Sequence, residues 1–208
     1  MRREAVQMLA GRAPPGNDLS FRRTGPKHAA LVRMSTNPNR TIFSLALGII
    51  AFDQLTKLLV LRYLGFAEER EVIPGFFKFV HLGNTGAAWS MFTGNNNTLA
   101  VVAAVAVLLL FIFRHHFGIH TLGGRMSLGL LFGGIIGNLI DRLTPSRQHV
   151  VDFLYFYVVR RDGQIAGFPA FNVADSAICI GVGLLFLLSW QGDNSSTPAP
   201  AAVRDAKS

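Results

Sequence analysis

Four stretches of the chain are apolar and approach the length needed to cross a lipid bilayer, and this feature restricts the fold more than any other. They cover residues 41–64, 98–113, 126–143 and 172–190. A helix that spans the hydrocarbon layer needs about 20 mostly apolar residues. Only 15% of the 208 residues are charged, against roughly 25% in a typical soluble domain. We therefore predict an all-α membrane protein with four transmembrane helices.

The positions of Lys and Arg predict how these helices are oriented. Eight of the 20 Lys and Arg residues lie in the first 40 positions, and such residues concentrate on the cytoplasmic side of a membrane. Four crossings then return the C-terminus to the cytoplasm, and the connections 65–97 and 144–171 face outward. We expect residues 1–40 to be a basic, disordered cytoplasmic arm, 41–191 to form the membrane domain, and 192–208 to be a disordered cytoplasmic tail.

The outer connection 65–97 carries the signals of a small β structure. Pro74 followed by Gly75 is typical of a turn. Residues 76–82 are aromatic and β-branched with partial alternation, which favours a short strand or hairpin. We therefore predict a small extracytoplasmic β-rich element between the first and second helices.

Charged and polar side chains interrupt the first and third apolar stretches. They are costly in lipid and indicate function by default. Asp53 and Lys57 share a helix face at i and i+4 and can pair, which we interpret as a structural pair. Asn138 and Arg142 share a face in the same way, with Asp141 pointing elsewhere. Arg142 either reaches the outer interface or orients a carboxylate or a substrate headgroup.

Two further acids flank the outer ends of the third and fourth stretches. Taken singly, Asp152 is an ordinary loop acid, and Asp175 is a favourable charge near a helix N-terminus. Because consecutive spans run antiparallel, however, the two carboxylates can meet. Close carboxylates push their pKa values apart, so one can activate water while the other protonates the leaving amine. Asn172 lies on the same helix face as Asp175.

Other peptidase chemistries lack their sequence signatures. There is no HExxH zinc motif and no GxSxG nucleophile motif. The single cysteine, Cys179, excludes an intrachain disulfide and a Cys-based zinc site, and we interpret it as a small residue that packs between helices. We therefore expect no metal and no cofactor.

Two other classes of protein stay open on the residues alone. A small proton-coupled carrier or channel also needs ionisable groups in the membrane, but it should spread them across the membrane depth and show repeated halves. A non-enzymatic scaffold could use the close helix packing that glycines at four-residue spacing allow. Such glycines occur at Gly129, Gly133 and Gly137, but a scaffold would not require two acids at facing helix ends.

Five short motifs resemble, in order and spacing, those of the lipoprotein signal peptidase family, also called signal peptidase II. The similarity covers about residues 42–190. Each motif alone is weak, but five in order on four spans form a specific pattern. They are Asp53-Gln54-x-x-Lys57, Asn84-Thr85-Gly86-Ala87-Ala88-Trp89-Ser90, Gly133-Gly134-x-x-Gly137-Asn138-x-x-Asp141-Arg142, Val151-Asp152-Phe153 and Phe171-Asn172-Val173-Ala174-Asp175-Ser176. Trp89 departs from the family, which more often has Phe there.

The resemblance implies an aspartic endopeptidase that removes signal peptides from bacterial prolipoproteins. It would cleave before a diacylglyceryl-modified cysteine at the outer face of the cytoplasmic (inner) membrane, among membrane lipids, without nucleic acid and as a monomer. Asp152 and Asp175 would be the catalytic pair. The remaining matched positions are Asn84, Asn138, Arg142 and Asn172, which would bind substrate or support the pair, and Asp53 and Lys57, which would be structural or supporting.

Overall fold

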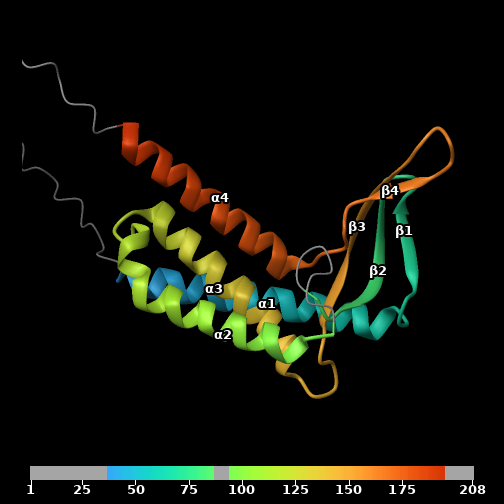
Figure 1. Cartoon of the computed structure of the whole chain (residues 1–208), viewed down its shortest axis with the longest axis horizontal. Coiled ribbons are helices and arrows are strands. Elements are labelled where there is room, and N and C mark those ends of the chain that lie inside the picture. Colours follow the sequence, from blue (N-terminus) through green and yellow to red (C-terminus); the bar gives the residue numbers. More distant parts are fainter. Residues whose placement is uncertain (1–36, 87–93, 195–208) are drawn as a thin grey trace, which may run out of the picture. The chain divides into compact units, whose positions relative to one another are not determined.

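Four long helices dominate the computed structural model, which describes residues 37–86 and 94–194 (Figure 1). They are α1 (Pro38–Tyr63), α2 (Asn96–Phe113), α3 (Leu122–Leu143) and α4 (Val173–Asn194), with a short 3-10 helix, η2 (Arg114–Phe117), after α2. Each is long and apolar enough to cross a membrane. A mostly helical chain with four such helices is thus confirmed. The predicted arm and tail lie mostly outside the described residues, as does Trp89.

Local capping defines where the helices begin. Asn37 caps α1 by accepting a hydrogen bond from the Asn39 backbone N–H at 3.0 Å, and Pro38 occupies the first turn, where its missing N–H costs nothing. The Thr121 hydroxyl accepts from the Gly124 N–H at 3.0 Å, so α3 starts at Leu122. Thr121 is a polar cap, and hydropathy alone would therefore begin this helix several residues later.

Helix α3 is the centre of the bundle and packs against α1, α2 and α4. Its glycines make the close approach possible. A Cβ at Gly133 would lie 2.6 Å from Ile49 Cβ of α1, and one at Gly134 would lie 2.4 Å from the Ala174 carbonyl oxygen of α4. The predicted close packing by the glycine face is confirmed, and Gly134 adds a second close contact on the side facing α4.

The four strands form one antiparallel sheet in the order β1-β2-β3-β4. They are β1 (Glu69–Ile73), β2 (Phe77–Asn84), β3 (Val150–Val159) and β4 (Ile165–Gly167). The turn at Pro74 and Gly75 is confirmed, because the Phe76 N–H donates to the Ile73 carbonyl at 3.0 Å and Gly75 has φ 74°.

The sheet extends beyond the connection in which we predicted it. Strands β3 and β4 belong to the other outer connection, and β3 pairs with β2 through Phe77 and Phe156 and through Gly83 and Val151. The interpretation of Asp152 as a loop acid is therefore wrong, because it lies on β3. The aromatic and β-branched residues of 150–159 favour a strand once a partner strand is available.

Helix α4 uses one face for packing and leaves the other exposed. Ala174 and Ala177 are buried, whereas Ile180 and Val182 are more than half exposed. Cys179 is also exposed, so its prediction as a packing residue is wrong. The small residues that contact the neighbouring helix are the alanines and Gly181, whose Cβ would lie 2.9 Å from Leu131 Cγ.

The end of the bundle next to the sheet brings several chain segments together. The C-terminal end of α3 and the N-terminal end of α4 lie beside the base of β3 (Figure 1). The C-terminal part of α1 also contacts β3 through a buried cluster of Val60, Val151 and Phe153. Most of the polar residues identified in the sequence therefore lie at one end of the helices.

Candidate active site

Asp152 and Asp175 lie on different elements, β3 and the first turn of α4, and one asparagine contacts both. The Asn172 side-chain amide donates to Asp152 Oδ1 at 2.7 Å, and the Asn172 backbone N–H donates to Asp175 Oδ2 at 3.2 Å. Asn172 is 0% exposed and Asp152 is 3% exposed, while Asp175 is partly buried. The antiparallel arrangement thus brings the two acids to one site.

Two further amides hold the remaining carboxylate oxygens. The Asn84 side chain, at the end of β2, donates to Asp152 Oδ2 at 2.9 Å. The Asn138 side chain, on α3, donates to Asp175 Oδ1 at 2.7 Å. All four carboxylate oxygens therefore accept a hydrogen bond from an asparagine. Because each oxygen has a second lone pair, the pair can still accept from a water or a substrate group.

The surroundings of Asp152 favour its protonated form. Burial raises the pKa of Asp152 to about 7, and the nearby charge of Asp175 adds to that effect. Hydrogen bonds from Asn84 and Asn172 act in the opposite direction, because they stabilise the ionised carboxylate. The pair is thus arranged to hold one proton near neutral pH, which suits acid and base roles in one step.

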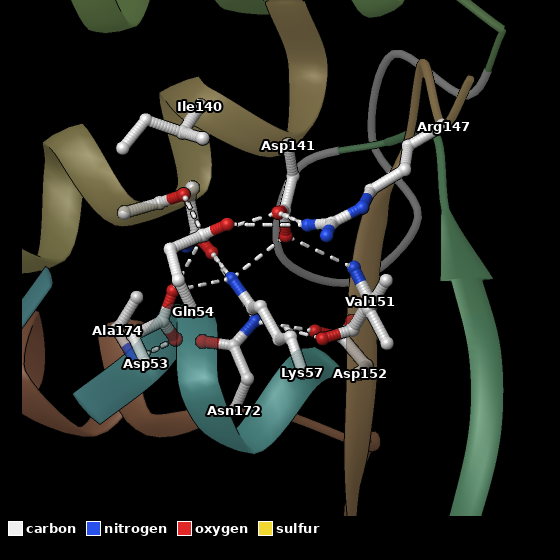
Figure 2. A network of polar contacts seen from close by, with 12 residues as sticks. Asp53, Gln54, Lys57, Ile140, Asp141, Arg147, Val151, Asp152, Asn172 and Ala174 are labelled. Carbon is white, nitrogen blue, oxygen red and sulfur yellow. Dashed lines mark hydrogen bonds and ion pairs between the residues drawn. The ribbon is translucent and has the colours of Figure 1, made fainter. Parts of the chain in front are cut away.

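A second layer of charges, on α1 and α3, lies beside Asp152 and Asn172 (Figure 2). Lys57 Nζ lies 2.8 Å from Asp53 Oδ2 and 2.8 Å from Asp141 Oδ2, and it donates to Asn138 Oδ1 at 2.9 Å. All three charged residues are 0% exposed. The predicted pair of Asp53 and Lys57 is confirmed, and its ammonium also orients the amide that reaches Asp175.

From the sequence, Asp141 was expected to point elsewhere than Asn138 and Arg142, but in the structure Asp141 and Asn138 both contact Lys57. Asp141 lies four residues after Gly137 and eight after Gly133, so it continues the face of α3 that contacts α1. The spacing of the glycines was therefore the signal that could have identified it. Fully buried, Asp141 pairs with Lys57 and also accepts from the Val151 backbone N–H at 3.3 Å.

Two residues that the sequence analysis did not select complete the second layer. Arg147, in the loop between α3 and β3, donates to Asp141 Oδ1 at 2.5 Å and to Gln54 Oε1 at 3.2 Å. The Gln54 amide lies 3.2 Å from Asp53 Oδ2 and 3.1 Å from Asp141 Oδ1. Gln54 stood within a recognised motif, whereas nothing in the loop sequence indicated that Arg147 folds back onto α3.

Arg142 extends from α3 towards α2 and the end of β2. It donates to the Gly86 carbonyl at 2.8 Å and to Asn96 Oδ1 at 3.2 Å, and Asn96 donates back to the Arg142 carbonyl at 3.0 Å. Within the described residues its hydrogen-bond partners are thus a backbone carbonyl and an amide. In residues 37–86 and 94–194, no group of three His, Cys, Asp or Glu side chains is placed to hold a metal ion.

Comparison with known proteins gives consistent matches over most of the chain. The sequence model of the family described as Signal peptidase (SPase) II matches residues 45–191. The lipoprotein signal peptidase of Symbiobacterium thermophilum is 45% identical over 149 residues, which cover 70% of this chain and 93% of that protein. That of Bacillus subtilis is 40% identical over 147 residues, covering 70% and 90%.

Two solved structures described as bacterial membrane enzymes share the fold. One, at 2.3 Å resolution, has a TM-score of 0.67 and 29% identity, and the match covers 77% of this chain and 93% of that one. The other, at 1.9 Å resolution, has a TM-score of 0.59 and 30% identity, with 72% and 92% covered. Together with the four apolar helices, these matches identify a multi-pass membrane protein.

Proposed function

Because this chain belongs to the signal peptidase II family of aspartic proteases, which remove signal peptides from prolipoproteins, we propose that Asp152 and Asp175 are its catalytic pair. The observation that supports the pair most directly is the shared contact through Asn172, whose amide reaches one carboxylate while its backbone N–H reaches the other. Two acids that are bridged by one asparagine can hold one proton between them.

The pair would hydrolyse the peptide bond without a covalent intermediate. The ionised carboxylate takes a proton from water, and the resulting hydroxide attacks the scissile carbonyl carbon. The protonated carboxylic acid donates its proton to the carbonyl oxygen, which gives a tetrahedral diol. As the C–N bond breaks, the carboxyl that took the water proton passes it to the leaving nitrogen, and the other carboxylate takes back a proton from a diol hydroxyl as the new carboxylic acid forms. We assign these roles to the pair as a unit, because its apparent pKa values belong to both groups together.

The other matched positions would support this chemistry. Asn138 and Asn172 orient the two carboxylates, and Asn84 orients Asp152 from the sheet side. Arg142 lies close to the same end of the bundle through its bond to Gly86 and would act on the substrate side. Asp53 and Lys57 would support the pair from the second layer.

The preferred substrate is a prolipoprotein whose cysteine carries a diacylglyceryl group, cleaved just before that cysteine. Acyl chains anchored in the bilayer would hold the scissile bond at a fixed depth. Asp152, on β3, and Asp175, in the first turn of α4, lie at the end of the bundle next to the sheet, which is a suitable depth for this bond if the sheet faces outward. We place the 41–191 peptidase domain in the bacterial cytoplasmic membrane, as a monomer with both termini cytoplasmic.

Cleavage by purified protein tests this proposal. A diacylglyceryl-modified prolipoprotein and its unmodified form are incubated with detergent-solubilised wild type, Asp152→Asn, Asp175→Asn and the control Asp162→Asn, all with EDTA present. Asp162 is an exposed loop acid whose side chain accepts only from the Gln164 N–H among described contacts. We expect wild type and control to cleave the modified substrate and both pair variants to be inactive. Normal turnover by either pair variant would reject the assignment.

A further inference from the structure

The two carboxylates of the second layer each hold the backbone directly before one acid of the proposed catalytic pair. Asp53 Oδ1 accepts from the Ala174 N–H at 2.9 Å, and Ala174 precedes Asp175. Asp141 Oδ2 accepts from the Val151 N–H at 3.3 Å, and Val151 precedes Asp152. Figure 2 shows both contacts in one view. Helix α4 and strand β3 are thus anchored in the same way, each at the residue that precedes its acid.

A single ammonium group joins these two anchors. Lys57 Nζ lies 2.8 Å from a carboxylate oxygen of each, and its third hydrogen bond goes to Asn138 Oδ1 at 2.9 Å. The three N–H groups of Lys57 are therefore all satisfied. The Asn138 amide is fixed with its oxygen towards Lys57 and its nitrogen towards Asp175, at 2.7 Å. Lys57 thus determines which end of this amide meets the carboxylate.

The charges of this layer balance, which explains how it can be buried. Asp53 and Asp141 supply two negative charges, and Lys57 and Arg147 supply two positive ones, with ion pairs of 2.8, 2.8 and 2.5 Å. Buried ions need both partners and well-formed hydrogen bonds to offset the cost of leaving water. Such a buried network of ion pairs adds little to the free energy of unfolding compared with an apolar core. It does hold its side chains in one defined arrangement.

We infer that Asp53, Lys57 and Asp141 form a clamp that sets the separation of Asp152 and Asp175. This inference rests on the proposed function, since it assigns these three as positioning residues for the same reaction. The clamp acts through backbone: one carboxylate locates the first turn of α4, the other locates the start of β3, and Lys57 fixes the distance between them. Asp141, which the sequence analysis did not assign, is as important as Asp53.

Steady-state kinetics with the modified prolipoprotein test the clamp in Asp53→Asn, Asp141→Asn and the double variant. Each single variant leaves Lys57 one carboxylate partner. We expect kcat per folded molecule to fall about 10- to 100-fold in each, since displacement of reacting groups by about 1 Å costs roughly that much. KM should change less than about twofold, because no contact to substrate is removed.

The double variant separates one clamp from two independent effects. If both carboxylates act through Lys57, losing either one releases the clamp. The double variant should then have about the same kcat as the less active of the two single variants. If the fold-loss in kcat of the double variant equals the product of the fold-losses of the two single variants, the two carboxylates act independently and the single clamp is overturned. Should an Asn variant fail to accumulate, Asp141→Glu keeps the charge but lengthens the arm, and a wild-type kcat there would also overturn it.

Failure of the clamp and failure of the proposed function give different results. If Asp152→Asn retains turnover, the catalytic pair is wrong. If Asp152→Asn and Asp175→Asn are inactive while Asp53→Asn and Asp141→Asn keep wild-type kcat, the pair stands and only the clamp is rejected. The clamp is rejected in this case even if its variants have a lower melting temperature. A purely structural role would lower stability but leave kcat per folded molecule unaltered.

Discussion

Gly137 lies against the carboxylate of Asp53, and a Cβ at this position would be 2.8 Å from Asp53 Oδ2 and 3.3 Å from Ala174 Cβ. The oxygen concerned is the one that pairs with Lys57. Helix α3 therefore has to present a bare backbone here, between α1 and the first turn of α4.

Gly137→Ala should reduce cleavage strongly, because the added methyl group would displace Asp53 from Lys57 or push α4 outward. The matched control is Gly48→Ala on α1, where a Cβ would meet nothing within 4 Å. Alanine is favoured over glycine in a helix by about 1 kcal/mol, so the control should be fully active and at least as stable as wild type. Thermal unfolding and turnover of both variants check this, and equal activity in the two would contradict it.

The pH dependence of cleavage should show an alkaline limit near pH 7. The pKa of Asp152 is raised to about 7, so the fold favours the protonated carboxyl, and the single proton of the pair is lost as the pH rises through that value. The same raised pKa affects folding: protonated Asp152 adds to the free energy of unfolding. This contribution is fully present below about pH 4 and is lost as the pH rises through about 7. A kcat profile between pH 5 and 9 measures the limit, and a flat profile would argue against a proton-sharing pair.

Asn84→Ala should shift this alkaline limit to higher pH. Its amide donates to Asp152 Oδ2 at 2.9 Å and lowers the pKa of Asp152, so its removal leaves the ionised form less stable. The position of the limit, taken from the same profile normalised to its maximum, is independent of any loss in kcat. A shift to lower pH would show that Asn84 stabilises the neutral form instead.

Asn172→Ser and Asn172→Ala should differ in stability but not in activity. The Asn172 side-chain oxygen accepts from the Asp175 N–H at 2.9 Å, which is the geometry of a helix N-cap, and serine preserves such a cap while alanine costs about 1 kcal/mol. Neither replacement can donate to Asp152 as the amide does. Denaturation should therefore place the alanine variant below the serine variant, while both lose cleavage at least about tenfold, since the amide orients a carboxylate of the proposed pair.

Arg147→Gln should lower the melting temperature while reducing kcat less than Asp141→Asn does. Asp141 would lose one cation at 2.5 Å but keep Lys57 at 2.8 Å and its contact to Val151. Arg160→Gln, in an exposed position, controls for loss of a positive charge in the same connection. If Arg147→Gln were as inactive as Asp141→Asn, the loop arginine would itself be part of the positioning device.

The supporting role of Asn84 was expected from the family resemblance, whereas the residues alone were sufficient to predict the four apolar helices, the glycine packing and the approach of Asp152 to Asp175. These depend on local periodicity and on charges in apolar surroundings, which are visible in a single chain. Pairing between β2 and β3 joins residues such as Gly83 and Val151, and no local pattern specifies a partner so distant. Arg147 was missed for a related reason, because the path of a loop is determined by the elements that it connects.

The sheet also fixes when during synthesis the enzyme can become active. Strand β2 lies between α1 and α2, whereas β3 lies between α3 and α4, so Asn84 and Asp152 meet only after three helices have been made. Asp175 and its anchor at Ala174 arrive with α4, the last of them. With Asp152 and Asp175 as the proposed catalytic pair, a chain still emerging from the ribosome has no working site, and proteolytic activity in the membrane would begin only when the final helix has been inserted.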